Sequence, residues 1–195
     1  DEDSELNILL SASDIDGDDL TYSITGGSDI TATLDGSDVV FSAPADYNGS
    51  ESFTVSVSDA EYTDSQSITV TVNAVNDAPT ANAASGITNE DQSTVIALSG
   101  SDIDGDNLTY SLSTDAVNGS VTLDGSLATY TPNTDYNGAD SFSFTVSDGE
   151  YSSSAEVSVT ITAVNDAPVL ATVSDVSFDE DGLGSTSLSA NDVDG

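Results

Sequence analysis

The chain has 195 residues, of which 36 are Asp or Glu and none is Lys, Arg or His, so its formal charge is −36. Without cationic side chains it cannot bind nucleic acid by neutralising phosphates, and an anionic membrane surface would repel it. Without Cys or His it can form no disulfide, no structural zinc site and no Ser-His-Asp or Cys-His catalytic centre. The apolar stretches are too short for membrane insertion. Only oxygen ligands remain for chemistry.

The sequence repeats itself at intervals of 88 to 90 residues. Val75–Pro79 returns as Val164–Pro168, and the Asp-Ile-Asp-Gly-Asp run at 14–18 returns at 102–106. Asp-Tyr-Asn-Gly occurs at 46–49 and again at 135–138, and Glu-Asp pairs begin at Glu2, Glu90 and Glu180. A repeat of this length is a small domain. We therefore predict three units: 1–78, a repeat lacking its first strand; 79–168, a complete repeat; and 169–195, the opening strands of a third.

Within each unit, apolar and polar residues alternate with a period of two. In chain order the first unit alternates at 20–24, 53–57 and 68–72. Such alternation, rich in β-branched and aromatic residues, indicates half-buried antiparallel strands, and no segment favours a helix. The complete unit accommodates seven strands, near 81–88, 93–99, 107–113, 119–123, 127–131, 140–147 and 154–163. Seven short strands in about 90 residues predict an all-β fold of tandem two-sheet Ig-like sandwiches in a linear array, without a disulfide.

Acidic residues recur at the same points of each unit, in loops that a sandwich gathers at its two ends. The linkers at 75–79 and 164–168 place Asn and Asp beside a conformationally restricted Pro. A solvated, halophile-like surface would explain the amount of charge, but it does not explain this placement. The recurrence therefore points to a binding role at the unit boundaries.

These motifs resemble the bacterial cadherin-like tandem repeats of large calcium-binding surface adhesins, and the similarity spans the whole chain. Asn76–Pro79 resembles the cadherin interdomain linker, and Asp102–Asp104 its paired-aspartate motif. Ser147–Gly149 resembles the Asp that follows the penultimate strand. The resemblance implies cadherin-like sandwiches with Ca²⁺ held at each junction between units.

Carried over by position, the resemblance implies ligands at three places. The first junction would use Glu2, Asp46, Asn48, Asn76, Asp77, Asp102, Asp104 and Asp148. The second would use Glu90, Asp135, Asn137, Asn165, Asp166, Asp192 and Asp194. Asp14, Asp16 and Asp59 would face a preceding unit.

The sequence departs from the family pattern at two points of each unit. Asn48 and Asn137 stand where the family usually has Glu, and Ala74 and Ala163 replace the first Asp of the linker. Each change removes a charge, so we expect two or three ions per junction. The chemistry suits Ca²⁺, which takes six to eight hard oxygen ligands, better than Mg²⁺, which is smaller and retains its waters.

Other readings of the same motifs stay open at this stage. The Asp-x-Asp-Gly-Asp run resembles the opening of an EF-hand loop, but its Gly is misplaced and position twelve is Thr25 or Ser113 rather than Glu. The loop could also hold an ion by itself. Paired carboxylates could form a glycosidase centre, although nothing marks a substrate cleft. Tyr47 and Tyr136 could stack on sugars, but their place before a core strand favours packing.

The sequence thus predicts a non-enzymatic, calcium-rigidified extender of a secreted or cell-surface adhesin, located outside the cell, which spaces a distal binding module from the cell and supports adhesion or biofilm attachment. We expect the chain to be a window of a longer protein, with the neighbouring repeats as its partners. One alternative is an extracellular fibre in which residues 169–178 are donated as a strand to an identical protomer. Another is a homophilic or glycan-binding module.

Overall fold

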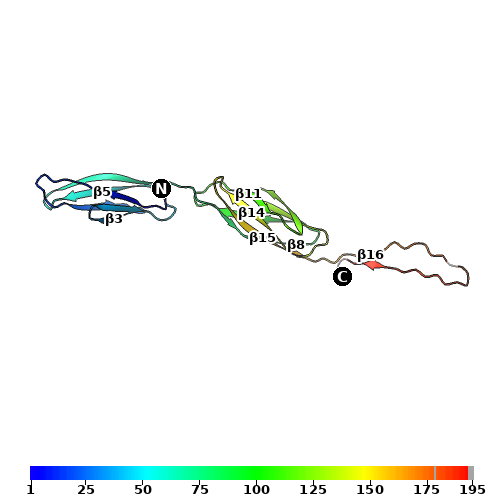
Figure 1. The fold of residues 1–195 in the computed structure, drawn as a ribbon. Coiled ribbons are helices and arrows are strands. Elements are labelled where there is room, and N and C mark those ends of the chain that lie inside the picture. Colours follow the sequence, from blue (N-terminus) through cyan, green and yellow to red (C-terminus); the bar gives the residue numbers. More distant parts are fainter. Residues whose placement is uncertain (178, 193–195) are drawn as a thin grey trace. The chain divides into compact units, whose positions relative to one another are not determined.

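The computed structural model describes residues 1–177 and 179–192, and these form an all-β chain (Figure 1). The described residues contain strands and loops but no helix, as the alternating pattern predicted. In this part of the chain there is accordingly no helix long and apolar enough to cross a membrane. The chain divides into two compact units, unit 1 at Asp1–Asn76 and unit 2 at Asp77–Gly195.

Unit 2 contains a sandwich of two main sheets. The first sheet has the order β11-β14-β15-β8, formed by β11 (Thr109–Thr114), β14 (Gly138–Ser147), β15 (Ser152–Thr162) and β8 (Ala84–Asn89). The second has the order β12-β13-β9, formed by β12 (Gly119–Asp124), β13 (Leu127–Pro132) and β9 (Thr94–Ala97). All neighbours pair antiparallel except β8, which lies parallel to β15. Figure 1 labels four of these strands in the green to yellow part of the chain.

The alternation in the sequence becomes the core of unit 2. Phe142, Phe144 and Val146 on β14 are buried, as are Val157, Val159 and Ile161 on β15, while the residues between them are more exposed. Tyr130 on β13 is completely buried and faces them from the second sheet. Tyr136 packs against this core, which agrees with a packing role for the tyrosine of the Asp-Tyr-Asn-Gly turn.

Two predicted strands of unit 2 are each split in two. The segment predicted as one strand at 81–88 forms β7 (Thr80–Asn82) and β8, and the segment predicted at 93–99 forms β9 and β10 (Ser99–Ser101). The physical reason is that the chain changes sheets: β7 pairs antiparallel with β10, whereas β8 pairs with β15. A continuous alternating pattern does not reveal such a crossing, because both halves bury one face.

Unit 1 repeats this plan with six strands. One sheet has the order β1-β4-β3, and the other has the order β2-β5-β6. Its buried core consists of Ile30, Val39, Phe41, Phe53 and Val70, with Tyr47 packed against it. The strands are β1 (Leu6–Leu9), β2 (Thr21–Gly26), β3 (Thr31–Asp35), β4 (Asp38–Ser42), β5 (Gly49–Ser58) and β6 (Thr63–Val72).

After the sandwich of unit 2, residues 169–192 form little regular structure. Only β16 (Val169–Leu170) and β17 (Ala190–Asn191) pair, antiparallel, over two residues each. The other described residues of this segment are exposed loop. Of the predicted opening strands of a third repeat, the described part thus shows only this short pairing.

A carboxylate holds the loop that crosses between the two sheets of unit 1. Glu51 accepts hydrogen bonds from the backbone N–H groups of Ser28 (2.8 Å), Asp29 (3.0 Å) and Ile30 (3.1 Å), and from the Ser28 hydroxyl (2.6 Å). Donors of this kind stabilise the charged form of a carboxyl group. They lower the pKa of Glu51 from 4.5 to about 2, with the Ser28 hydroxyl as the largest cause.

Asp140 has the same role in unit 2, but its hydroxyl donor is a tyrosine on another strand and not a serine of the loop. It accepts from the backbone N–H groups of Val117 (3.2 Å) and Asn118 (2.9 Å) and from the Tyr130 hydroxyl (2.8 Å). Burial and this hydrogen bond raise the pKa of Tyr130, so its hydroxyl remains protonated and donates. The counterpart of Tyr130 in unit 1 is Phe41, where the longer Glu51 needs no such donor.

We predict that Glu51→Gln flattens the acid limb of the stability curve. The folded state binds fewer protons than the unfolded state between pH 4.5 and about 2, so the stability that Glu51 contributes is present above this range and is lost as the pH falls through it. Urea unfolding across these pH values, without calcium, should give a smaller loss in the variant than in the parent chain. Glu61→Gln, at an exposed loop position, is the control; equal acid limbs for all three proteins would contradict the role of Glu51.

Candidate calcium sites

One glutamate of each unit is buried at the end of its sandwich. Glu2 is 5% exposed and Glu90 is 3% exposed. The backbone N–H of Glu2 donates to the carbonyl of Asn73 (2.9 Å), and that of Glu90 to the carbonyl of Thr162 (3.0 Å). These bonds fix both glutamates beside the end of the last strand of their own unit.

Each buried carboxylate also binds the start of the segment that leaves its unit. Oε1 of Glu2 accepts from the backbone N–H of Val75, and Oε1 of Glu90 accepts from that of Val164. The other oxygen is less well satisfied. Oε2 of Glu2 is buried without a hydrogen-bond partner, and Oε2 of Glu90 has only a 3.4 Å contact from Nδ2 of Asn137. Burying a charged group is costly unless it is paired.

No side chain of this protein can supply a compensating positive charge, because the sequence contains no Lys, Arg or His. A carboxylate oxygen that is buried and lacks a donor is therefore a candidate site for a cation from solution. Hard, oxygen-preferring cations such as Ca²⁺ match a donor set made only of carboxylates, amides and carbonyls. The residues present thus fit the ion that the sequence predicted.

Aspartates gather around each buried glutamate in an unusual backbone conformation. Asp3 and Asp46 in unit 1 have φ of 56° and 57°, and Asp91 and Asp135 in unit 2 have φ of 59° and 56°. In both units the second of the pair donates its backbone N–H to Oδ1 of the first, at 3.2 Å. The left-handed region is costly for most non-glycine residues but is tolerated best by Asn and Asp. The two units therefore place these side chains by the same local geometry.

In unit 2 this arrangement brings three carboxylates together. Asp91, Asp135 and Asp166 each offer an oxygen atom, and these atoms lie within 4.8 Å of one another. Like charges about 4 Å apart repel by roughly 1 kcal/mol even in bulk water, so a shared divalent cation would relieve the repulsion. The acidic cluster is compatible with a Ca²⁺ site.

Sequence reasoning did not include Asp3 and Asp91 among the candidate ligands, although both belong to acidic clusters of the structure. Both belong to the repeated Glu-Asp pairs that begin at Glu2 and Glu90, yet the resemblance assigned a role only to the glutamate. Recurrence of the aspartate was the signal that could have identified them. That recurrence does not predict the left-handed conformation that brings Asp91 next to Asp135.

The paired-aspartate loops at the other end of each sandwich are shaped by their first aspartate. Oδ1 of Asp102 accepts from the backbone N–H groups of Asp104 (3.0 Å) and Asp106 (3.3 Å). Its other oxygen, Oδ2, is buried without a hydrogen-bond partner. Oδ2 of Asp104 accepts from the backbone N–H of Asp77 (2.7 Å). One oxygen of Asp102 thus builds the turn, while the other offers a coordination position.

Unit 1 contains the same turn. Oδ1 of Asp14 accepts from the backbone N–H groups of Asp16 (2.8 Å), Gly17 (2.9 Å) and Asp18 (3.3 Å). Local hydrogen bonds to the first carboxylate, an Asx-type turn, thus account for the Asp-x-Asp-Gly-Asp spacing in both units.

The aspartate after the penultimate strand is held in the same way in both units. Oδ1 of Asp59 accepts from the backbone N–H groups of Glu61 (2.8 Å) and Tyr62 (2.6 Å), and Asp148 accepts from Glu150 (2.6 Å) and Tyr151 (2.7 Å). The hydrogen bond from Tyr62, followed by that from Glu61, lowers the pKa of Asp59. Its carboxylate therefore stays charged at neutral pH, as a cation ligand requires.

The described residues bring the remaining predicted ligands together less completely. Asn137 reaches Glu90, but its counterpart Asn48 is exposed. Asn76 is half-buried in the linker, and the amide of Asn165 donates to the carbonyl of Asp166 (2.7 Å). Asp192 is exposed. The predicted ligand Asp194, like residue 178 of the predicted donor strand, lies outside the described residues.

Two repeats of the chain match a known family. The model of the bacterial Ig domain matches residues 1–71 and again residues 76–162. The chain belongs to the bacterial Ig domain family. It contains two such domains in tandem, which are typical of secreted and surface proteins and are usually non-catalytic. No curated protein sequence matches the chain.

Solved structures confirm the cadherin-like fold of these Ig domains. Human protocadherin-24 EC1-2 matches with a TM-score of 0.55 and 18% identity, covering 80% of this chain and 88% of that chain. Mouse protocadherin-24 EC1-3 matches with a TM-score of 0.53 and 16% identity, covering 96% of this chain and 69% of that one. An endo-fucoidan hydrolase of glycoside hydrolase family 107 matches at 23% identity with a TM-score of 0.40 over 84% of this chain; the match spans only 27% of the hydrolase.

We predict that Glu90→Gln weakens calcium binding by at least about ten-fold at this end of unit 2, because it removes one ligand charge from a buried position. Without calcium the variant should unfold at the same or a higher temperature, since a buried uncompensated charge is lost. With calcium it should gain less thermal stability than the parent chain.

The measurement is thermal unfolding with excess calcium and with chelator. Glu156→Gln, which removes an exposed charge on β15, serves as the matched control and should behave as the parent chain does. A stability loss for Glu90→Gln that is equal in both conditions would contradict a ligand role and indicate a structural one.

Proposed function

We propose that this chain is a calcium-stiffened spacer in a secreted or cell-surface protein of the adhesin type. The observation that supports it most is the buried Glu2 carboxylate: 5% exposed, with one oxygen lacking a hydrogen-bond partner, in a chain without a single basic side chain. Burying a charged group is costly unless it is paired, and a cation from solution is the positive charge that this chain could use. Glu90 is equally buried in the second Ig domain, where its second oxygen has a 3.4 Å contact from the amide of Asn137.

In this proposal the linker couples the two domains through shared ligands. Only seven residues separate Val72, the end of β6, from Thr80, the start of β7. Val75 binds the carboxylate of Glu2 in unit 1, while Asp77 binds the carboxylate of Asp104 in unit 2. The resemblance to cadherin-like repeats then assigns the two carboxylate sets to one junction. Its ions would replace repulsion between neighbouring domains with common ligands.

The consequence of such coupling is mechanical. Where ligands come from two domains, the free energy of calcium binding becomes free energy of the folded, extended state. A row of these domains would hold a distal binding module away from the cell, and adhesion or biofilm attachment would follow from that spacing. The proposal gives the repeats no catalytic role and places the protein outside the cell, where free calcium is high enough to occupy sites of modest affinity.

The test is a calcium titration by calorimetry in physiological salt. We expect two or three ions per junction for the parent chain, and loss of at least one of them in the double variant Asp102→Ala with Asp104→Ala. The matched control is Asp14→Ala with Asp16→Ala. It changes the same turn in unit 1, where the corresponding junction would be formed with a preceding repeat.

Stiffening has its own readout. Small-angle scattering should give a larger and better-defined maximum dimension with calcium than with chelator, and the Asp102/Asp104 variant should not respond. If the parent chain binds calcium only weakly, with competition by monovalent salt, the acids serve as surface solvation and the spacer mechanism is wrong.

A further inference from the structure

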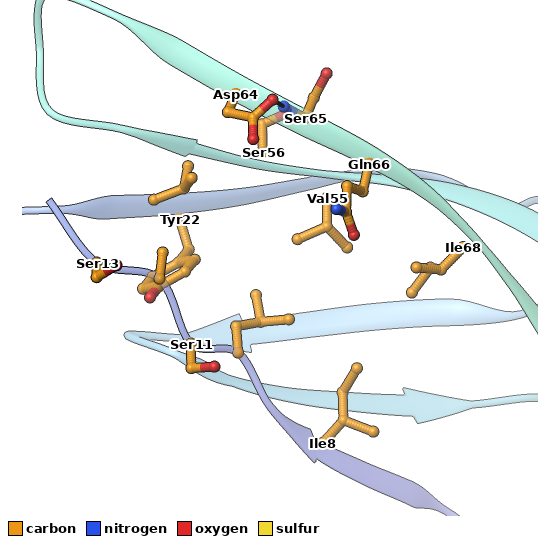
Figure 2. Close-up of a pocket in the computed structure, with 13 residues that line it drawn as sticks. Ile8, Ser11, Ser13, Tyr22, Val55, Ser56, Asp64, Ser65, Gln66 and Ile68 are labelled. Carbon is orange, nitrogen blue, oxygen red and sulfur yellow. Dashed lines mark hydrogen bonds between the residues drawn. The ribbon is translucent and has the colours of Figure 1, made fainter.

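The β2-β5-β6 sheet of unit 1 has two chemically different sides. β5 pairs antiparallel with β2 and with β6 in continuous register, so residues opposite each other point to the same side of the sheet. The inward side contributes Phe53 and Val70 to the core. Figure 2 shows Tyr22, Val55 and Ile68 pointing into the space between the two sheets. Because successive side chains of a strand alternate, the residues between these point outward.

Every paired residue on the outward side of this sheet is a serine or a threonine. Apart from Ser56 and Ser58, which are half-buried, all of them are exposed. We call this surface the hydroxyl face. It comprises Thr21, Ser23, Thr25, Ser50, Ser52, Thr54, Ser56, Ser58, Thr63, Ser65, Ser67, Thr69 and Thr71. The surface therefore offers hydroxyl and methyl groups and no other kind of side chain.

No carboxylate belongs to the hydroxyl face, although the chain has a formal charge of −36. Glu51 and Asp64 lie on the same strands but belong to the inward side, where Glu51 holds the crossing loop. The acids next to the strand ends, Asp46, Asp59 and Glu61, lie in loops. Like charges repel, so a second copy of this chain can approach the hydroxyl face without carboxylates meeting directly.

Most hydroxyl groups of the hydroxyl face are not used within the domain. Ser50 and Thr71 bond to each other (2.9 Å), and the hydroxyls of Thr21 and Ser58 donate to backbone carbonyls (3.1 and 2.8 Å). Within the part of the chain that the structure describes, the other hydroxyls of the face make no hydrogen bond. Each can both donate to and accept from a partner.

Unit 2 has a similar outward side with one charge in it. Its β11-β14-β15-β8 sheet also presents mostly serine and threonine outward. Glu156, however, lies on this side near the middle of β15, opposite Ser143, and is exposed. The counterpart of Glu156 in unit 1 is Ser67, which lies opposite Thr54. A single position thus distinguishes the charge of the two surfaces.

We propose that the hydroxyl face of unit 1 binds the same face of a second copy of this chain, and that Glu156 keeps the corresponding surface of unit 2 out of such contacts. Identical surfaces that both donate and accept are self-complementary, as an interface with two-fold symmetry requires. A glycan fits less well, because the hydroxyl face has no aromatic ring on which a sugar could stack. A cationic partner would be attracted to the acidic loops instead.

The size of the hydroxyl face predicts a weak contact. β5 and β6 have ten residues each and β2 has six. With strands about 4.8 Å apart and about 3.3 Å per residue, each copy would contribute roughly 400 Å². A total of roughly 800 Å² is typical of transient encounters, so we expect a dissociation constant on the order of 0.1–1 mM. At the cell surface proposed above, a high local density of copies would compensate for this weakness; the pairing itself does not depend on that location.

Two reciprocal variants of the whole chain test the proposal by sedimentation in physiological salt. Ser67→Glu gives the hydroxyl face the charge of unit 2, and Glu156→Ser gives unit 2 the uncharged surface of unit 1. We expect dimers of the parent chain, an association weakened roughly ten-fold or more by Ser67→Glu, and a stronger association for Glu156→Ser. The control is Thr33→Glu, which adds the same charge at an exposed position of β3 and should leave the association unchanged.

The order of the variants should be the same with calcium and with chelator, because the hydroxyl face contains no candidate ligand. This separates the proposal from the calcium-dependent function. In NMR spectra of the parent chain, the signals that shift with concentration should come from β2, β5 and β6. A parent chain that is monomeric up to about 1 mM, or equal effects of Ser67→Glu and Thr33→Glu, would overturn the proposal. A neutral polysaccharide that shifts the same signals in a chain that does not self-associate would assign the hydroxyl face to a glycan and would contradict the second copy as its partner.

Discussion

Carboxylates in this protein have no Lys, Arg or His to pair with, and this constraint governs where each acid can lie. An exposed carboxylate is stabilised by water and screened by salt. A buried one must be compensated by main-chain N–H groups, hydroxyl groups or cations from solution. The structure shows the first two directly and leaves other buried oxygens without a donor, and this difference separates acids that maintain the fold from candidate metal ligands.

Glu51 and Asp140 belong to the first group. Glu51 accepts four hydrogen bonds from one crossing loop. Asp140 accepts two from the corresponding loop and one from the Tyr130 hydroxyl on β13, so neither has an unmet need for a cation. Glu2 and Asp102 belong to the second group, because each uses one oxygen for the backbone while the other is buried without a donor. Burial by itself therefore does not make a carboxylate a candidate calcium ligand here; burial with an unsatisfied oxygen does.

Much of this organisation could be predicted from the sequence. Alternation located the strands 119–123 and 127–131 almost to the residue, since β12 and β13 occupy Gly119–Asp124 and Leu127–Pro132. The crossing at Ala83, which divides β7 from β8, could not be predicted, because a residue that changes sheets does not interrupt the polar and apolar pattern. The placement of the Asp3 and Asp91 carboxylates depends on a left-handed backbone conformation. The hydroxyl group that donates to Asp140 belongs to Tyr130, which lies ten residues earlier on another strand. Both are tertiary facts.

The comparison of the two Ig domains shows which elements position the buried glutamate. Unit 1 lacks a strand along β6 among its described residues, yet Glu2 is buried as deeply as Glu90 and makes the same backbone bond to the end of the last strand. The acidic end of the domain is therefore organised by β6 and the following linker, without help from an opening strand.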